Sequence, residues 1–73
     1  MTKEDRKYIE QLGENIKNRR EALGYSQLDF AEKAGFSKGQ LHKIEHARNA
    51  LTVLTLRRIS LHLNTSIGEL CDF

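Results

Sequence analysis

The side chains best suited to chemistry recur at helical spacing between residues 37 and 47. At 100° per residue, Leu41 and Ile44 fall on one side of this stretch. The opposite side carries basic residues and one glycine: Lys38, Gly39, His42, Lys43 and His46. It holds no carboxylate, whereas a solvated surface helix usually mixes charge signs four residues apart. Lysines placed in this way can bond guanine O6 and N7 or DNA phosphates, so the pattern favours a nucleic-acid partner over a merely solvated face.

The two histidines on this side are four residues apart, a spacing that can also bind zinc. A zinc site needs further ligands, but Glu45 falls on the other side and Cys71 is remote in the sequence. We therefore expect no metal and no other cofactor. Catalysis is equally unsupported, because helix capping explains three of the four serines and no Ser–His–Asp arrangement is evident. The sequence predicts a protein that is not an enzyme.

Two short helices connected by a tight turn position the basic side. They are predicted at residues 27–34 and 38–47. Ser26 is a favourable N-cap for the first, and Gly35 stands where a helix C-cap adopts a left-handed conformation. Ser37 and Gln40 form a capping box at the start of the second. A link this short forces a sharp crossing, as in a helix-turn-helix whose second helix enters the DNA major groove.

Three further helices complete an all-α prediction without strands. They are expected from residue 3 or 4 to 23, from 53 to 63, and from 66 onward, with Thr52 and Ser66 as N-caps. The core side of the first is expected to carry Ile9, Leu12, Ile16 and Leu23. The core side of the second is expected to carry Val53, Leu56, Ile59 and Leu63, with Leu54 as an additional candidate. The last carries Ile67, Leu70 and Phe73 at a spacing of three.

A charged residue, Arg20, interrupts the apolar stripe of the first helix, four residues after Ile16. A charge on a core-facing stripe is costly unless it has a partner. Glu45 flanks the apolar side of the 38–47 helix and is the best candidate. We expect a buried Arg20–Glu45 pair; the alternative is that Arg20 extends along its stem to solvent.

Length and composition indicate one small domain over residues 1–73. The net charge is only +2, but residues 33–58 hold six Lys or Arg against Glu45 alone, so the basic charge coincides with the 38–47 helix. Cys71 is the only cysteine, which excludes an internal disulfide and favours a reducing cytoplasm. No apolar run is long enough for a signal peptide or a membrane span, so neither a membrane nor secretion is expected.

At this point the sequence resembles a known family, the Cro/C1-type helix-turn-helix domains of lambdoid phage repressors and restriction–modification controller proteins. The motif residues at the family spacing are Gln27, Ala31, Gly35, Leu41, Ile44 and Glu45. Flanking matches are Ile16, Arg20, Thr52, Leu56, Ile59 and the segment 66–70. The resemblance covers roughly residues 12–70. It implies a compact five-helix, lambda-repressor-like fold with its motif at about residues 27–46.

The resemblance also implies roles for individual residues. Base edges would be read by Lys38, Gly39, His42 and Lys43, and by Gln27, which would also brace on a phosphate. Phosphate contacts would come from Ser26, Gln40, Arg48 and Asn49. Arg20 and Glu45 match the family's buried ion pair, in agreement with the stripe argument. Ala47 departs from the pattern, because the family often has glycine there.

The expected function is that of a sequence-specific double-stranded DNA-binding transcriptional regulator, such as a repressor. A single reading helix gives little specificity, so we expect a homodimer on a palindromic operator. Its interface is expected at Ile67, Leu70 and Phe73. No small-molecule ligand is evident. The alternative is an antitoxin or the DNA-binding subunit of a larger protein assembly.

Overall fold

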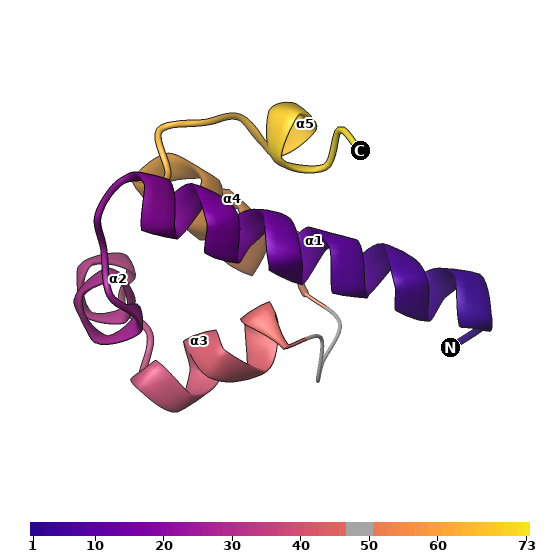
Figure 1. The fold of residues 1–73 in the computed structure, drawn as a ribbon, viewed down its shortest axis with the longest axis horizontal. Helices are drawn as coiled ribbons and strands as arrows, with labels where there is room; N and C mark the ends of the chain where they lie inside the picture. Colours follow the sequence, from indigo (N-terminus) through magenta and orange to yellow (C-terminus); the bar gives the residue numbers. More distant parts are fainter. Residues whose placement is uncertain (47–50) are drawn as a thin grey trace.

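The computed structural model describes residues 1–46 and 51–73. Five α-helices and no strand occur in these two segments: α1 (Lys3–Ala22), α2 (Gln27–Ala34), α3 (Lys38–Glu45), α4 (Val53–His62) and α5 (Ile67–Leu70). The predicted all-α, five-helix architecture is confirmed. In Figure 1, α2 and α3 lie on one side of the long helix α1 and α5 on the other, with α4 behind it.

Each helix begins at a hydroxyl side chain that accepts a hydrogen bond from the backbone N–H three residues later. These N-caps are Thr2, Ser26, Ser37, Thr52 and Ser66. At α3 the predicted capping box is complete, because the Gln40 Oε1 also accepts a hydrogen bond from the backbone N–H of Ser37 at 2.8 Å. The four N-caps that the sequence predicts are confirmed; Thr2, which forms a full box with Asp5, was not predicted.

The ends of the motif helices follow local sequence chemistry as well. Gly35 closes α2 with a φ of 84°, the left-handed conformation expected of it. The predicted first helix ends one residue later than α1 does, because Leu23 forms its C-cap. In α3 the last helical residue is Glu45 and His46 forms the C-cap. The predicted end at Ala47 lies outside the described residues.

One contiguous core joins all five helices. It consists of Leu12, Ile16, Phe30, Ala31, Ala34, Leu41, Ile44, Ile59, Leu63 and Leu70. The core prediction is wrong for three residues. The exposed fraction is 76% for Val53, 66% for Leu54 and 43% for Leu23. Val53 is the first residue of α4, whose buried residues Ile59 and Ser60 lie further along the helix. Leu54 lies on the opposite side of α4 from the buried Ile59 and Leu63, about 140° and 180° around the helix. Leu23 is the C-cap of α1 and lies just beyond its last helical residue.

Candidate nucleic-acid interface

Helix α3 has the two-sided character that its sequence predicts. Leu41 and Ile44 are buried against the rest of the domain. Four of the five residues expected to read base edges are exposed on the opposite side: Lys38, Gly39, His42 and Lys43. The fifth, Gln27, is partly buried at the start of α2. The only carboxylate in α3, Glu45, is buried, so the exposed side of this helix is uniformly neutral or basic. Such a surface attracts phosphate and presents donors to base acceptors.

The two histidines of this surface stack on each other. Their ring centroids are 4.0 Å apart with 27° between the ring planes. The Nδ1 of His46 also lies 2.9 Å from the carbonyl oxygen of His42, within hydrogen-bonding distance. Among the described residues, no group of three His, Cys, Asp or Glu could hold a metal ion.

A buried ion pair holds α3 against α1. The Nε and Nη2 of Arg20 donate to the Oε2 and Oε1 of Glu45 at 2.7 and 3.1 Å. The Arg20 side chain is only 6% exposed and that of Glu45 is fully buried. The hydrogen bonds to Glu45 raise the pKa of the Arg20 guanidinium, against the lowering effect of burial. The predicted pair is confirmed, and the alternative in which Arg20 extends to solvent is wrong.

The same network continues to two other parts of the motif. Arg20 donates from Nη1 to the backbone carbonyl oxygen of Tyr25 at 2.7 Å, in the connection between α1 and α2. Gln27 donates from Nε2 to the Glu45 Oε1 at 3.0 Å. Glu45 therefore joins α1, α2 and α3. A carboxamide has two amide hydrogens and an acceptor oxygen, so Gln27 retains hydrogen-bonding capacity for a group outside the protein.

The residues expected to contact phosphate fall into two groups. Ser26 and Gln40 are exposed at the N-termini of α2 and α3, where both already take part in capping. Helix N-termini favour anions, because their first N–H groups and the helix dipole point outward. Arg48 and Asn49 lie outside the described residues, so their contribution stays a prediction.

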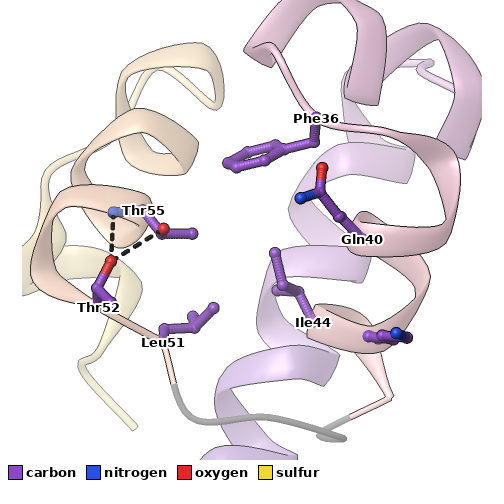
Figure 2. Close-up of a pocket in the computed structure, with 7 residues that line it drawn as sticks. Phe36, Gln40, Ile44, Leu51, Thr52 and Thr55 are labelled. Atoms are coloured by element: carbon purple, nitrogen blue, oxygen red, sulfur yellow. Dashed lines mark hydrogen bonds between the residues drawn. The ribbon is translucent and has the colours of Figure 1, made fainter.

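A cleft of about 320 Å³ lies between α3 and α4. Figure 2 shows Phe36, Gln40 and Ile44 on one wall and Leu51, Thr52 and Thr55 on the other. Lys43 also lines it. The cleft thus borders the exposed side of α3 and belongs to the same surface.

A sequence model of the helix-turn-helix family HTH_3 matches residues 16–70, three quarters of the chain and all of the motif just described. The chain belongs to the Cro/C1-type helix-turn-helix family. This confirms the resemblance found in the sequence. A Cro/C1-type domain is a DNA-binding regulator and not an enzyme.

One curated relative of this Cro/C1-type domain is the HTH-type transcriptional regulator SinR of Bacillus subtilis (strain 168). The two are 39% identical over 64 aligned positions, and the match covers 84% of this chain and 56% of SinR. The chain therefore spans little more than half the length of this relative. No significant match to a solved structure was found.

One contact in this Cro/C1-type domain that the sequence did not predict is at Gly13. A Cβ atom placed on Gly13 would lie 2.6 Å from the carbonyl oxygen of Glu45 and 2.9 Å from that of Ile44. The backbones of α1 and α3 therefore touch directly beside the buried ion pair. A signal was present, because glycine inside a long helix is unfavourable and often marks a close backbone approach.

The residues predicted to form a dimer interface have different surroundings. Leu70 is fully buried in its own domain, and Asn15 donates a side-chain hydrogen bond to its carbonyl oxygen. It offers no surface to a second chain, because the single turn of α5 directs it into the core. Ile67 is partly buried. Phe73 follows the helix, is 48% exposed and packs on Tyr8 with ring centroids 4.9 Å apart. The interface prediction is thus reduced to Ile67 and Phe73.

None of the helices in the described ranges is both long and apolar enough to cross a membrane.

Proposed function

We propose that this chain is a sequence-specific double-stranded DNA-binding transcriptional regulator that acts as a homodimer on a palindromic operator. The observation that carries the proposal is the exposed, carboxylate-free side of α3, held to α1 by the buried Arg20–Glu45 pair. A helix with a neutral or basic outer side and a rigid attachment is suited to reading bases in the major groove.

In the proposed complex, α3 lies in the major groove. Lys38 and Lys43 donate to guanine O6 and N7, and His42 faces a neighbouring base edge. Gln27 braces on a phosphate and reaches an adjacent base from the N-terminus of α2. The remaining phosphate contacts come from Ser26, Gln40, Arg48 and Asn49. These phosphate contacts fix the register, and the base contacts select the sequence.

The homodimer is proposed because one eight-residue helix reads too few base pairs for useful specificity. Two copies related by a two-fold axis double the contacts and match a palindromic site. Ile67 and Phe73, together with Tyr8 beneath the Phe73 ring, are the proposed contact surface. The similarity to SinR, a transcriptional regulator, supports a regulatory role for this chain. A regulator of this type would act in the cytoplasm, where the lone Cys71 stays reduced.

Selection from a pool of random duplexes tests this proposal. The enriched sequences should contain two related half-sites whose centres are about one helical turn apart, on the order of 34 Å. Sedimentation of the purified protein should give the mass of two chains. If selection at moderate salt enriches no sequence, the chain is not a sequence-specific regulator.

An antitoxin or the DNA-binding subunit of a larger assembly is the second candidate. It is favoured by exposed apolar side chains near the projecting end of α1, where Met1 is 73% exposed and Tyr8 46%. A different protein could cover them instead of a second copy. Stable co-purification of an unrelated chain at a fixed ratio would favour this candidate, and a pure homodimer would exclude it.

A further inference from the structure

Gly39 stands at a position where the fold does not require glycine. It is the second residue of α3 and its φ is not positive. A Cβ placed on it would have the Ser37 Oγ, 4.0 Å away, as its nearest neighbour. Gly13 has no such room, and Gly24 and Gly35 have φ values of 82° and 84° that favour glycine. An alanine would therefore fit at position 39.

The missing side chain leaves a recess in the exposed side of α3. Glycine is among the least favourable residues in a helix. Its presence at position 39 therefore does not serve the stability of α3. Its neighbours on the helix surface are Lys38 in the sequence, and His42 and Lys43, three and four residues on. All three are exposed. The Gly39 Cα, which carries only C–H groups, thus forms the floor of the recess, and the side chains around it donate hydrogen bonds.

The chemistry of the recess at Gly39 favours one kind of base-pair edge. The Gly39 Cα has only C–H groups to present, so a base acceptor or donor pressed against it would lose water without gaining a strong partner. The C5 methyl of thymine is the one apolar group that base pairs expose in the major groove. We propose that the recess at Gly39 receives the C5 methyl of a thymine, so that the absence of a side chain specifies a T·A pair. This inference rests on the proposed function.

The chain offers a matched control at Gly68. It is the second residue of α5, just as Gly39 is of α3, and each follows a serine N-cap by two residues. A Cβ on Gly68 would also meet only a cap hydroxyl, the Ser66 Oγ, at 3.8 Å. Residues 59–73 contain no Lys or Arg, so Gly68 lies outside the basic surface. Gly39→Ala and Gly68→Ala therefore make the same local change on two different surfaces.

The test measures binding of the parent protein and both variants to the operator obtained by selection, and to duplexes in which each thymine in turn is replaced by deoxyuridine. Deoxyuridine removes only the methyl group. Gly39→Ala should weaken binding to the thymine operator on the order of tenfold, the effect typical of one wrong base pair. Gly68→Ala should bind as the parent does. Both should melt at or above the parent temperature, because alanine is the better helix former.

At one thymine the two proteins should respond in opposite directions. Deoxyuridine there should weaken the parent, which loses its methyl contact, and strengthen Gly39→Ala, which loses a clash. The inference is overturned if Gly39→Ala binds the operator as tightly as the parent. It is also overturned if the loss is the same on every deoxyuridine duplex, because another group then meets Gly39. If the parent selects no sequence at all, the proposed function fails; if only these responses are missing, the recess assignment alone fails.

Discussion

Gln27 donates a hydrogen bond to the carboxylate of Glu45, the same carboxylate that pairs with Arg20. The residue expected to brace on DNA is thus held by the charge that anchors α3 to α1. Because one carboxylate serves both contacts, the position of Gln27 at the N-terminus of α2 depends on the buried pair. The network links the stability of the domain to the geometry of its proposed DNA contacts.

Gln27→Ala should therefore affect folding and binding together. Loss of one hydrogen bond to a charged group should cost roughly 1.5–3 kcal/mol of unfolding free energy, with the lower end expected at this partly buried site. Affinity for random duplexes should fall because the phosphate contact is lost, and affinity for the preferred site should fall further because Gln27 is also proposed to reach a base. Urea unfolding and fluorescence anisotropy measure the two effects. Gln11→Ala is the control, since Gln11 is exposed on α1; an equal effect of both changes on DNA affinity would contradict the role of Gln27.

Arg20→Met should be strongly destabilising. It leaves the fully buried Glu45 side chain without its cation, which should cost roughly 3–5 kcal/mol of a total stability on the order of 5–15 kcal/mol. Glu45→Gln should cost less, because an amide oxygen can still accept from Arg20. Arg19→Met is the neighbouring control, since Arg19 is only partly buried. Thermal melting of the three variants tests the ranking, and an Arg20→Met protein that melts within a degree or two of the parent would refute it.

Gly13→Ala should also destabilise the protein, although alanine is the better helix former. The new methyl group would lie 2.6 Å from a backbone carbonyl oxygen, so α1 and α3 must move apart. Overpacking of this kind costs roughly 1–3 kcal/mol. Denaturant unfolding should show a lower midpoint than for Gly68→Ala, whose methyl group meets no backbone. Equal midpoints for the two variants would mean that the helices do not touch at Gly13.

Lys43→Ala and Arg48→Ala should separate base from phosphate contacts. Lys43→Ala should lose roughly 1–3 kcal/mol of binding energy for the preferred site and little for random DNA. Arg48→Ala should weaken binding to both and reduce the slope of log affinity against log salt by about one unit. Titrations at several salt concentrations measure these quantities. Parallel losses on random DNA for both variants would remove Lys43 from the set of base readers.

Phe73→Asp should convert the proposed dimer to a folded monomer. A charge introduced beside Tyr8 enters an apolar contact and faces its own two-fold copy, whereas the terminus contributes little to the fold of one domain. Sedimentation should show one chain, circular dichroism unchanged helix content, and anisotropy much weaker operator binding. Leu61→Asp is the control, because Leu61 is similarly exposed, on α4. A Phe73→Asp protein that remains dimeric at micromolar concentration would move the interface to Leu51, Leu54 or α1.

Local chemistry made much of this structure predictable. N-caps such as Ser37, and Gly35 at the end of α2, interact with backbone groups only a few positions away in the sequence. The sequence alone therefore indicates them. The Arg20–Glu45 pair could be predicted because an isolated charge on an apolar stripe demands a partner. Errors arose where packing between distant elements decides. Nothing local tells that Leu70 is taken into the core, or which element of the fold Gly13 meets.

The separation between the two sides of α3 has an evolutionary consequence. The side chains that anchor the helix, Leu41, Ile44 and Glu45, are buried, whereas those that would meet a base pair are exposed. If Lys38, His42 and Lys43 read bases as proposed, substitutions there alter operator preference without creating a cavity or an unpaired buried charge. A duplicated gene for this chain could acquire a new set of target promoters through a few surface mutations. Each intermediate variant along that path would still fold.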